Sequence, residues 1–103
     1  MIKTNFMSFV FNFTPGAPGM NASKYDECIR KLEEAGARNP KGRLYHVCFG
    51  DTNNLMVMDI WDSVENFQKF GQILMPILKE IGVDPGQPNP HPAYNVIEAP
   101  AYA

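Results

Sequence analysis

The order of hydrophobic patterns along this chain of 103 residues constrains its fold more than any other feature. Two segments with apolar residues at helical spacing alternate with four segments that are typical of strands. The expected order is strand, helix, strand, strand, helix, strand, which is the ferredoxin-like β-α-β-β-α-β arrangement of α+β domains. Residues 1–103 are therefore expected to form a single domain with one four-stranded antiparallel sheet. Two helices cover only one face of such a sheet, so the other face must be polar or be covered by something else.

Four segments rich in aromatic and aliphatic residues are predicted to be strands. They span residues 6–13, 44–49, 55–61 and 93–98. The middle two are joined by a turn-forming run, Gly50-Asp51-Thr52-Asn53-Asn54, which is typical of a hairpin. If a four-residue loop separates Gly50 from Leu55, Cys48 faces Val57 and His46 faces Asp59 across the two strands.

Two segments are predicted to be helices. The first begins near Ser23, where Ser23 and Asp26 resemble a capping box, and the second begins at Asp62 or Ser63. Glycines at positions 36 and 82 are natural C-terminal stops. Pro76 lies inside the second pattern and is expected to kink or divide that helix. The buried stripes are Tyr25, Cys28, Ile29, Leu32 and Ala35, then Phe67, Phe70, Leu74, Ile77, Leu78 and Ile81.

Alternation along the strands sorts their residues onto two faces. We assign the more apolar set to the helix side: Met7, Phe9, Phe11, Phe13, Tyr45, Val47, Phe49, Met56, Met58 and Ile60. The set assigned to the open face is mixed: Phe6, Ser8, Val10, Asn12, Leu44, His46, Cys48, Leu55, Val57, Asp59 and Trp61. A face with this mixture is too apolar for bulk water and too polar for a plain core. It suits a partly dry pocket that a partner chain closes.

The cross-strand pair of His46 and Asp59 is the sharpest chemical feature of this mixed face. A carboxylate beside an imidazole fixes its tautomer, and such a pair in an apolar pocket can act as a general base. We therefore predict His46 as the catalytic base and Asp59 as its orienting partner, although such pairs also occur as plain structural contacts. The predicted substrate-binding residues are Asn12, Ser8, Cys48 and Trp61, of which Trp61 forms a wall or part of the packing.

Charge and motif content exclude several classes of function. The formal net charge is −2 and no run of Lys or Arg occurs, so neither nucleic acid nor an anionic membrane surface is an expected partner. No metal-ligand spacing and no phosphate or dinucleotide loop is visible, so no metal and no cofactor is predicted. The two cysteines, Cys28 and Cys48, indicate free thiols in a reducing compartment, and no signal or membrane-spanning segment is recognised. We expect a cytoplasmic protein.

The junction Asp59-Ile60-Trp61-Asp62-Ser63, followed by Glu65, Phe67 and Phe70, carries a resemblance to a known family. It resembles the pattern W-[DE]-S-x-E-x-F of antibiotic biosynthesis monooxygenase-like domains in the dimeric α/β-barrel superfamily. Further matching pieces are Tyr25-Asp26, Leu32-Glu33-Glu34-Ala35-Gly36-Ala37, Gly42-Arg43-Leu44-Tyr45-His46-Val47 and Leu74-Met75-Pro76-Ile77-Leu78. The resemblance covers about residues 6–98, and the fuller pattern also resembles a set of small members of that group.

This resemblance implies a homodimer in which two ferredoxin-like protomers pack sheet against sheet to form a barrel. It also implies a small hydrophobic substrate, since some members are cofactor-free oxygenases of aromatic compounds that deprotonate the substrate and let it react with dioxygen. Haem-degrading members carry a Trp where this chain has Phe70, and a His where it has Glu80. The leading hypothesis is a cofactor-independent monooxygenase-like enzyme. A non-catalytic module that binds hydrophobic ligands and a purely structural homodimer are the alternatives.

Overall fold

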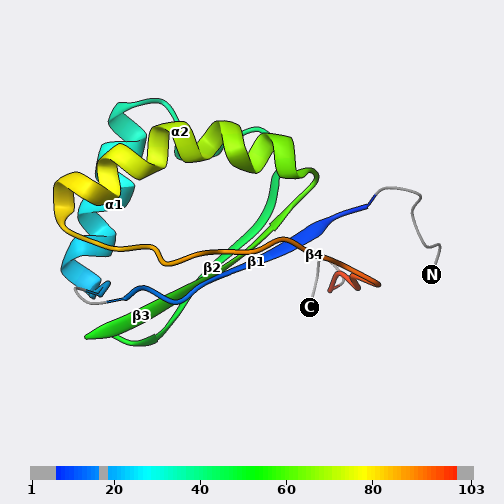
Figure 1. Cartoon of the computed structure of the whole chain (residues 1–103), viewed down its shortest axis with the longest axis horizontal. Coiled ribbons are helices and arrows are strands. Elements are labelled where there is room, and N and C mark those ends of the chain that lie inside the picture. Colours follow the sequence, from blue (N-terminus) through cyan, green and yellow to red (C-terminus); the bar gives the residue numbers. More distant parts are fainter. Residues whose placement is uncertain (1–6, 17–18, 100–103) are drawn as a thin grey trace.

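The computed structural model describes residues 7–16 and 19–99, so the predicted strand residue Phe6 lies outside the described part (Figure 1). The elements, in chain order, are β1 (Phe9–Phe13), α1 (Ala22–Glu34), β2 (Arg43–Asp51), β3 (Asn54–Trp61), α2 (Val64–Ile81) and β4 (His91–Pro92). The sheet order is β2-β3-β1-β4 and the pairs are antiparallel. Both helices lie on one side of the sheet (Figure 1). The predicted α+β ferredoxin-like fold is confirmed.

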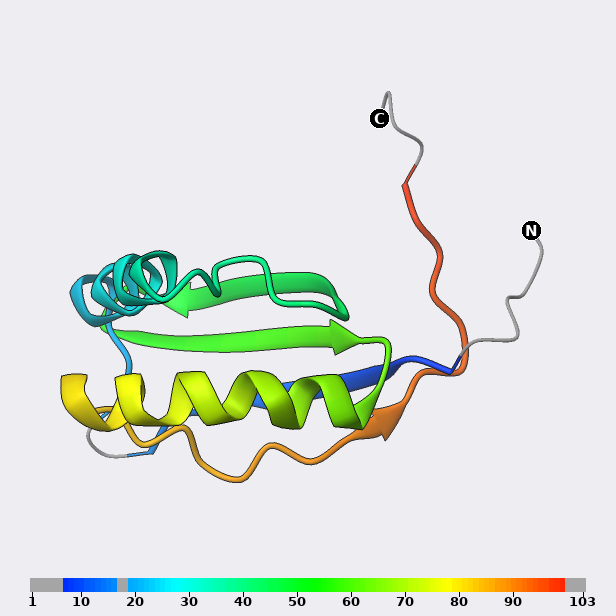
Figure 2. The same ribbon diagram turned by 90° about the horizontal axis from the view of Figure 1, so that it is seen from above.

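The fourth strand differs from its prediction. Only His91 and Pro92 pair with β1, and the predicted strand over residues 93–98 does not form. The backbone N–H of Ala93 still donates to the carbonyl oxygen of Ser8, at 2.8 Å. Beyond that point the chain leaves the layered part of the molecule (Figure 2). Pro90 and Pro92 have no backbone donor, which limits the pairing available to this edge strand.

Both helices begin one residue after a side-chain cap. Asn21, rather than the predicted Ser23, caps α1, and its Oδ1 accepts a hydrogen bond from the Lys24 N–H at 2.8 Å. Ser63 caps α2 and accepts from the Asn66 N–H at 3.1 Å. Pro76 does not divide α2, which is continuous. Pro76 and Gln72, whose carbonyl oxygen lacks its usual partner, are both exposed, so the missing hydrogen bond is on the solvent side of the helix.

The core lies between the sheet and the two helices and is built around aromatic rings. Phe11 and Trp61 are its largest fully buried side chains. The Phe67 ring of α2 stacks on Phe11 with centroids 3.9 Å apart, and meets Trp61 edge-on at 5.7 Å. Burial of rings this large is the main stabilising contribution available to a small domain. It fixes α2 over β1 and β3.

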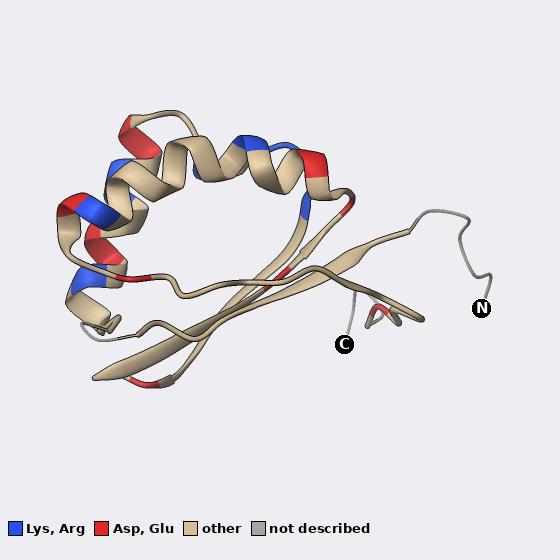
Figure 3. Ribbon diagram, viewed as in Figure 1, with Lys and Arg blue, Asp and Glu red and all other residues tan. Residues whose placement is uncertain are grey.

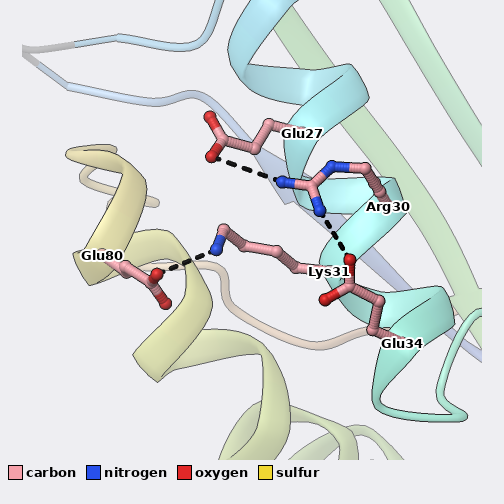
Figure 4. Close-up of polar contacts among 5 residues, drawn as sticks. All are labelled: Glu27, Arg30, Lys31, Glu34 and Glu80. Atoms are coloured by element: carbon pink, nitrogen blue, oxygen red, sulfur yellow. Dashed lines mark hydrogen bonds and ion pairs between the residues drawn. The ribbon is translucent and has the colours of Figure 1, made fainter.

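Charged residues lie mainly on the helices, and the strands carry few of them (Figure 3). Lys31 of α1 forms an ion pair with Glu80 near the end of α2, with Nζ and Oε1 2.8 Å apart (Figure 4). Lys24 donates to the carbonyl oxygen of Gly82 at 3.3 Å. Exposed pairs of this kind contribute at most about 1 kcal/mol, so apolar packing, not charge, holds the helices together.

The predicted faces of β2 and β3 are wrong. Phe11 faces Asp59 and Phe13 faces Val57 across β1 and β3, so directly opposed residues of the two strands share one side. The helix side therefore carries these residues of the hairpin: His46, Cys48, Leu55, Val57, Asp59 and Trp61. The open face carries the more apolar set: Tyr45, Val47, Phe49, Met56, Met58 and Ile60.

The physical reason for this inversion lies in hydrogen bonding. The prediction assigns the more apolar set to the helix side, whereas polar atoms are costly in a core only when they lack a partner. In the structure His46, Asp59 and Trp61 satisfy one another, so they lie beneath the helices without an unpaired buried side-chain atom among the described residues. The apolar open face is consequently the surface without a covering layer.

Candidate active site

The β2–β3 hairpin places His46 directly opposite Asp59, as the sequence predicted, and Cys48 opposite Val57. The strands extend further than expected, with Asp51 facing Asn54, so the turn itself contains only Thr52 and Asn53. The Nδ1 atom of His46 lies 2.7 Å from Oδ1 of Asp59. The two side chains therefore form a hydrogen bond, and their predicted contact is confirmed. Their catalytic role stays a prediction.

Asp59 is the buried charged residue of the described core, with 3% of its surface exposed. Its second carboxylate oxygen accepts a hydrogen bond from the indole N–H of Trp61 at 3.2 Å. The indole nitrogen is only a donor, so the carboxylate must accept it. The two oxygens of Asp59 are thus committed to two rigid partners, which fixes the orientation of the carboxylate toward His46.

Tyr25 of α1 completes the arrangement, and sequence reasoning assigned it to plain packing. Its hydroxyl oxygen lies 2.6 Å from Nε2 of His46, and the two rings are nearly parallel. In the neutral imidazole, Asp59 holds the proton on Nδ1, so Nε2 accepts the hydrogen bond from the tyrosine hydroxyl. The result is one continuous chain from Tyr25 through His46 to Asp59. The only sequence signal was a hydroxyl at the N-terminal end of a buried helical stripe.

Burial raises the pKa of Tyr25 above its ordinary value, and the nearby Cys48 contributes to the rise, whereas the positive charge of Arg43 lowers it. Tyr25 therefore keeps its hydroxyl proton at neutral pH. Burial also raises the pKa of the Cys48 thiol, with a further contribution from Asp26. Cys48 is accordingly a protonated side chain beside the site, not an activated thiolate.

Two hollows meet at Tyr25 and His46. The inner cavity lies between the sheet and both helices and has a volume of about 60 Å³. Its apolar lining includes Phe13, Cys28, Ile29, Phe70, Leu74, Leu78 and Val83. The outer hollow has a volume of about 380 Å³ and a more polar wall of Tyr25, Asp26, Ile29, Arg38, Asn39, Arg43 and His46. Typical ligand pockets measure roughly 300–1,000 Å³, so the outer hollow has that size and the inner cavity is much smaller.

The other predicted substrate-binding residues are divided between the two faces of the sheet. Trp61 is fully buried behind Asp59 and forms no part of the lining of these two hollows. Asn12 faces Met58 on the open side, so it does not share a cavity with His46. Ser8 precedes β1 and its carbonyl binds the chain after β4. The predicted pocket on the open face is thus replaced by hollows beneath the helices.

Within residues 7–16 and 19–99, no group of three or more His, Cys, Asp or Glu side chains is arranged to hold a metal ion. Both cysteines are free. No helix in the same ranges is long and apolar enough to cross a membrane.

No protein-family model and no curated protein sequence matches this chain. Solved structures with a similar fold do match it. A single-residue variant of SnoaB, a cofactor-independent oxygenase from Streptomyces nogalater, aligns with a TM-score of 0.59 and 14% identity, over 93% of this chain and 100% of that one. This chain has the fold of the antibiotic biosynthesis monooxygenase-like proteins, in agreement with the resemblance of its sequence.

Two further structures with this fold are proposed antibiotic biosynthesis monooxygenases. The one from Deinococcus radiodurans aligns with a TM-score of 0.55 and 14% identity, over 92% of this chain and 99% of that one. The one from Chloroflexus aurantiacus aligns with a TM-score of 0.54 and 16% identity, over 91% of this chain and 98% of that one. Identities this low establish the shared fold and leave the chemistry to be argued from the site.

Proposed function

We propose that this protein is a small-molecule enzyme, a cofactor-independent monooxygenase-like protein that acts on an aromatic or otherwise hydrophobic substrate. The observation that carries the proposal is the hydrogen-bonded chain from Tyr25 through His46 to Asp59, which reaches the boundary between an apolar cavity and a polar hollow. The fold shared with SnoaB, described as a cofactor-independent oxygenase, supports it.

In this proposal the hydrogen-bonded side chains of Tyr25, His46 and Asp59 together remove a proton from an activated CH₂ group of the substrate. The proton passes to the Tyr25 oxygen as the tyrosine hydroxyl proton passes to Nε2 of His46, and the Asp59 carboxylate stabilises the resulting imidazolium. The substrate carbanion then combines with dioxygen to give a peroxide anion, which takes a proton back from the chain. Loss of water leaves a carbonyl group, so one dioxygen and one CH₂ give one C=O and one water.

Oxygen uptake in the presence of aromatic and quinol-like compounds tests this proposal. The variant His46→Gln is expected to lose turnover while it keeps the fold, because glutamine cannot take up the proton. The matched control is His91→Gln, because His91 is exposed on β4 and belongs to neither hollow. Unchanged oxygen uptake in His46→Gln would remove His46 from the mechanism.

One observation favours a second candidate, a non-catalytic module that binds hydrophobic ligands. The Nε2 atom of His46 already accepts a hydrogen bond from Tyr25, so a substrate reaches it only through the tyrosine. Saturable binding of an aromatic compound, with no product under air, would support this candidate over the enzyme.

We also propose that the open face of the sheet is covered by a second copy of the chain. Val47 and Phe49 are each more than 40% exposed there, and their neighbours Met56, Met58 and Ile60 are apolar as well. A continuous apolar patch on a small protein is typical of an interaction surface. The shared fold with proteins of the dimeric barrel type supports a homodimer, and a stable one buries about 1,200–2,000 Å² in total.

A further inference from the structure

A bulge in β2 changes the face on which Arg43 lies. Arg43 faces Trp61, whereas Tyr45 faces Ile60, so one extra residue, Leu44, is accommodated between them. Regular alternation would place Arg43 with Tyr45 on the open face. Instead its guanidinium carbon lies 5.6 Å from the ring centroid of Phe70, beneath α2. Leu44 is left 52% exposed, so the bulge turns a partly buried arginine, rather than a leucine, toward the helix side.

The residue before Arg43 holds the strand in this position. Gly42 has a φ of +91°, and a Cβ atom on it would lie 2.5 Å from Oδ1 of Asp62. Its carbonyl oxygen accepts a hydrogen bond from the Asp62 N–H at 2.8 Å. Only glycine meets both the conformation and the close approach, so the backbone that directs Arg43 inward is sterically defined.

Arg43 differs in its partners from the other arginines. Arg30 and Arg38 each form an ion pair with a glutamate, and Glu33 pairs with Arg38 at 3.2 Å. No carboxylate among the described residues forms an ion pair with Arg43, whose Nη2 donates to the carbonyl oxygen of Arg38 at 2.8 Å. Arg43 lines both hollows, and its charge acts on the Tyr25 hydroxyl. The cation therefore stands beside the reactive chain without an ion pair to those residues, although Asp59 lines the inner cavity with it and Asp26 lines the outer hollow.

We infer that Arg43 binds the carboxylate of the substrate and that the substrates are small hydrophobic carboxylic acids. A guanidinium presents paired N–H donors that match the two oxygens of a carboxylate. The outer hollow offers room for this group, with Asn39 nearby and Asp26 on its exposed rim, while the apolar lining beyond His46 accepts the hydrophobic part. The inner cavity, at about 60 Å³, is too small for a polycyclic body, so the hydrophobic part must be compact and lie partly in the outer hollow. The assignment to a substrate rests on the proposed function.

Binding of benzoate and of its neutral analogue benzamide tests this inference without any turnover. Isothermal titration calorimetry is expected to give benzoate an affinity about tenfold higher than that of benzamide, the effect of one charge-assisted contact. Arg43→Gln is expected to reduce this preference to about twofold or less. Equal binding of the two probes to the unmodified protein, no saturable binding of benzoate, or a preference that survives Arg43→Gln would overturn the inference.

Two more variants separate a binding role from a structural one. Arg30→Gln removes an exposed arginine of α1 that lines neither hollow and pairs with Glu27 and Glu34 (Figure 4), and it is expected to leave the preference for benzoate unchanged. Arg43→Lys keeps the charge and is expected to retain part of the preference, which covers the case in which Arg43→Gln loses its fold. Loss of preference in Arg30→Gln, or its complete loss in a folded Arg43→Lys, would contradict carboxylate binding by charge.

The same titration distinguishes this inference from the proposed function. His46→Gln is expected to lose oxygen uptake and to keep its preference for benzoate, because Arg43 is unchanged in it. If only the enzyme proposal is wrong, oxygen uptake will be absent, but the unmodified protein and each variant that keeps Arg43 will still prefer benzoate. Failure of the inference alone would leave oxygen uptake dependent on His46.

Discussion

The hydroxyl of Tyr25 on α1 lies 2.6 Å from Nε2 of His46 on β2, so a helix and a strand meet at one hydrogen bond. The contact joins the two parts of the split β-α-β fold at the boundary of the inner and outer hollows. Since Asp59 already holds Nδ1, both ring nitrogens of His46 are engaged and its orientation is fixed. This geometry makes Tyr25, rather than His46, the member of the chain that a substrate meets first.

Tyr25→Phe is therefore expected to reduce turnover strongly. The substitution keeps the ring and removes the hydroxyl that relays the proton, and general acid–base groups typically contribute about 10²–10⁴-fold to rate. The loss of one part-buried hydrogen bond is expected to lower the free energy of unfolding by about 1 kcal/mol. Oxygen uptake and thermal unfolding measure the two effects. Tyr45→Phe, on the open face, is the control, and a Tyr25→Phe variant with unchanged kcat would show that the hydroxyl is only structural.

Asp59→Asn tests the buried end of the chain. An asparagine presents one oxygen and one NH₂ group to two donors, the Nδ1–H of His46 and the indole N–H of Trp61, so one donor loses its partner. We expect the free energy of unfolding to fall by about 1–3 kcal/mol, measured by urea denaturation. Asp26→Asn on the exposed side of α1 should change it by no more than about 0.5 kcal/mol. Equal effects of the two substitutions would contradict a buried, fully paired Asp59.

Local patterns in the sequence were sufficient for the order of elements and for the contact between His46 and Asp59. The hairpin turn is short, so the turn residues fix the register of β2 against β3. The same argument does not reach β1, because α1 and two loops separate it from the hairpin. The pairing of Phe11 with Asp59 could therefore not be read from any local signal, and the face of the whole hairpin was inverted.

The positions of Tyr25 and Arg43 in the site could not be predicted from the sequence, for two different reasons. Tyr25 lies on a regular helical stripe, where an aromatic residue is ordinary core, and only the tertiary structure brings it to His46. Arg43 owes its place to a bulge, and alternation assigns a residue on the far side of a bulge to the wrong face. Gly42 is the local signal of an irregular backbone there: a glycine can adopt a positive φ, and the structure gives it one.

Cys28 should make the stability of the protein depend on pH in the alkaline range. Burial raises the pKa of its thiol to about 11 from an ordinary value of 9.0. Above pH 9 the unfolded chain ionises this thiol and the folded chain does not, so stability is fully present below pH 9 and falls as the pH rises toward 11. The loss due to Cys28 is on the order of 2 kcal/mol.

Urea denaturation at a series of pH values measures this effect as a difference between variants. Cys28→Ala is expected to be less stable at neutral pH because of the small cavity it creates, and to lose less stability between pH 9 and 11 than the unmodified protein. Alkaline groups that do not interact with Cys28 titrate in both proteins and cancel in the comparison, whereas the pKa of Tyr25, which Cys28 helps to raise, falls slightly in the variant. Parallel pH profiles for the two proteins would contradict the raised pKa of Cys28.

Phe49→Glu tests the proposed homodimer at an exposed aromatic residue of the open face. Phe49 faces Met56 on the open side of the sheet and is 43% exposed, so a second sheet packed there would bury its ring. A carboxylate at this position would be buried without a partner, and loss of a large apolar contact of this kind weakens an interface by about 2 kcal/mol or more, or about 30-fold in Kd. Analytical ultracentrifugation is expected to find a dimer for the unmodified protein and a folded monomer for Phe49→Glu at micromolar concentration.

Met75→Glu places the same charge on an exposed residue of α2, which lies above the opposite face of the sheet, and should leave the dimer intact. A monomeric unmodified protein, or equal dimerisation of the two variants, would mean that the apolar face has another occupant.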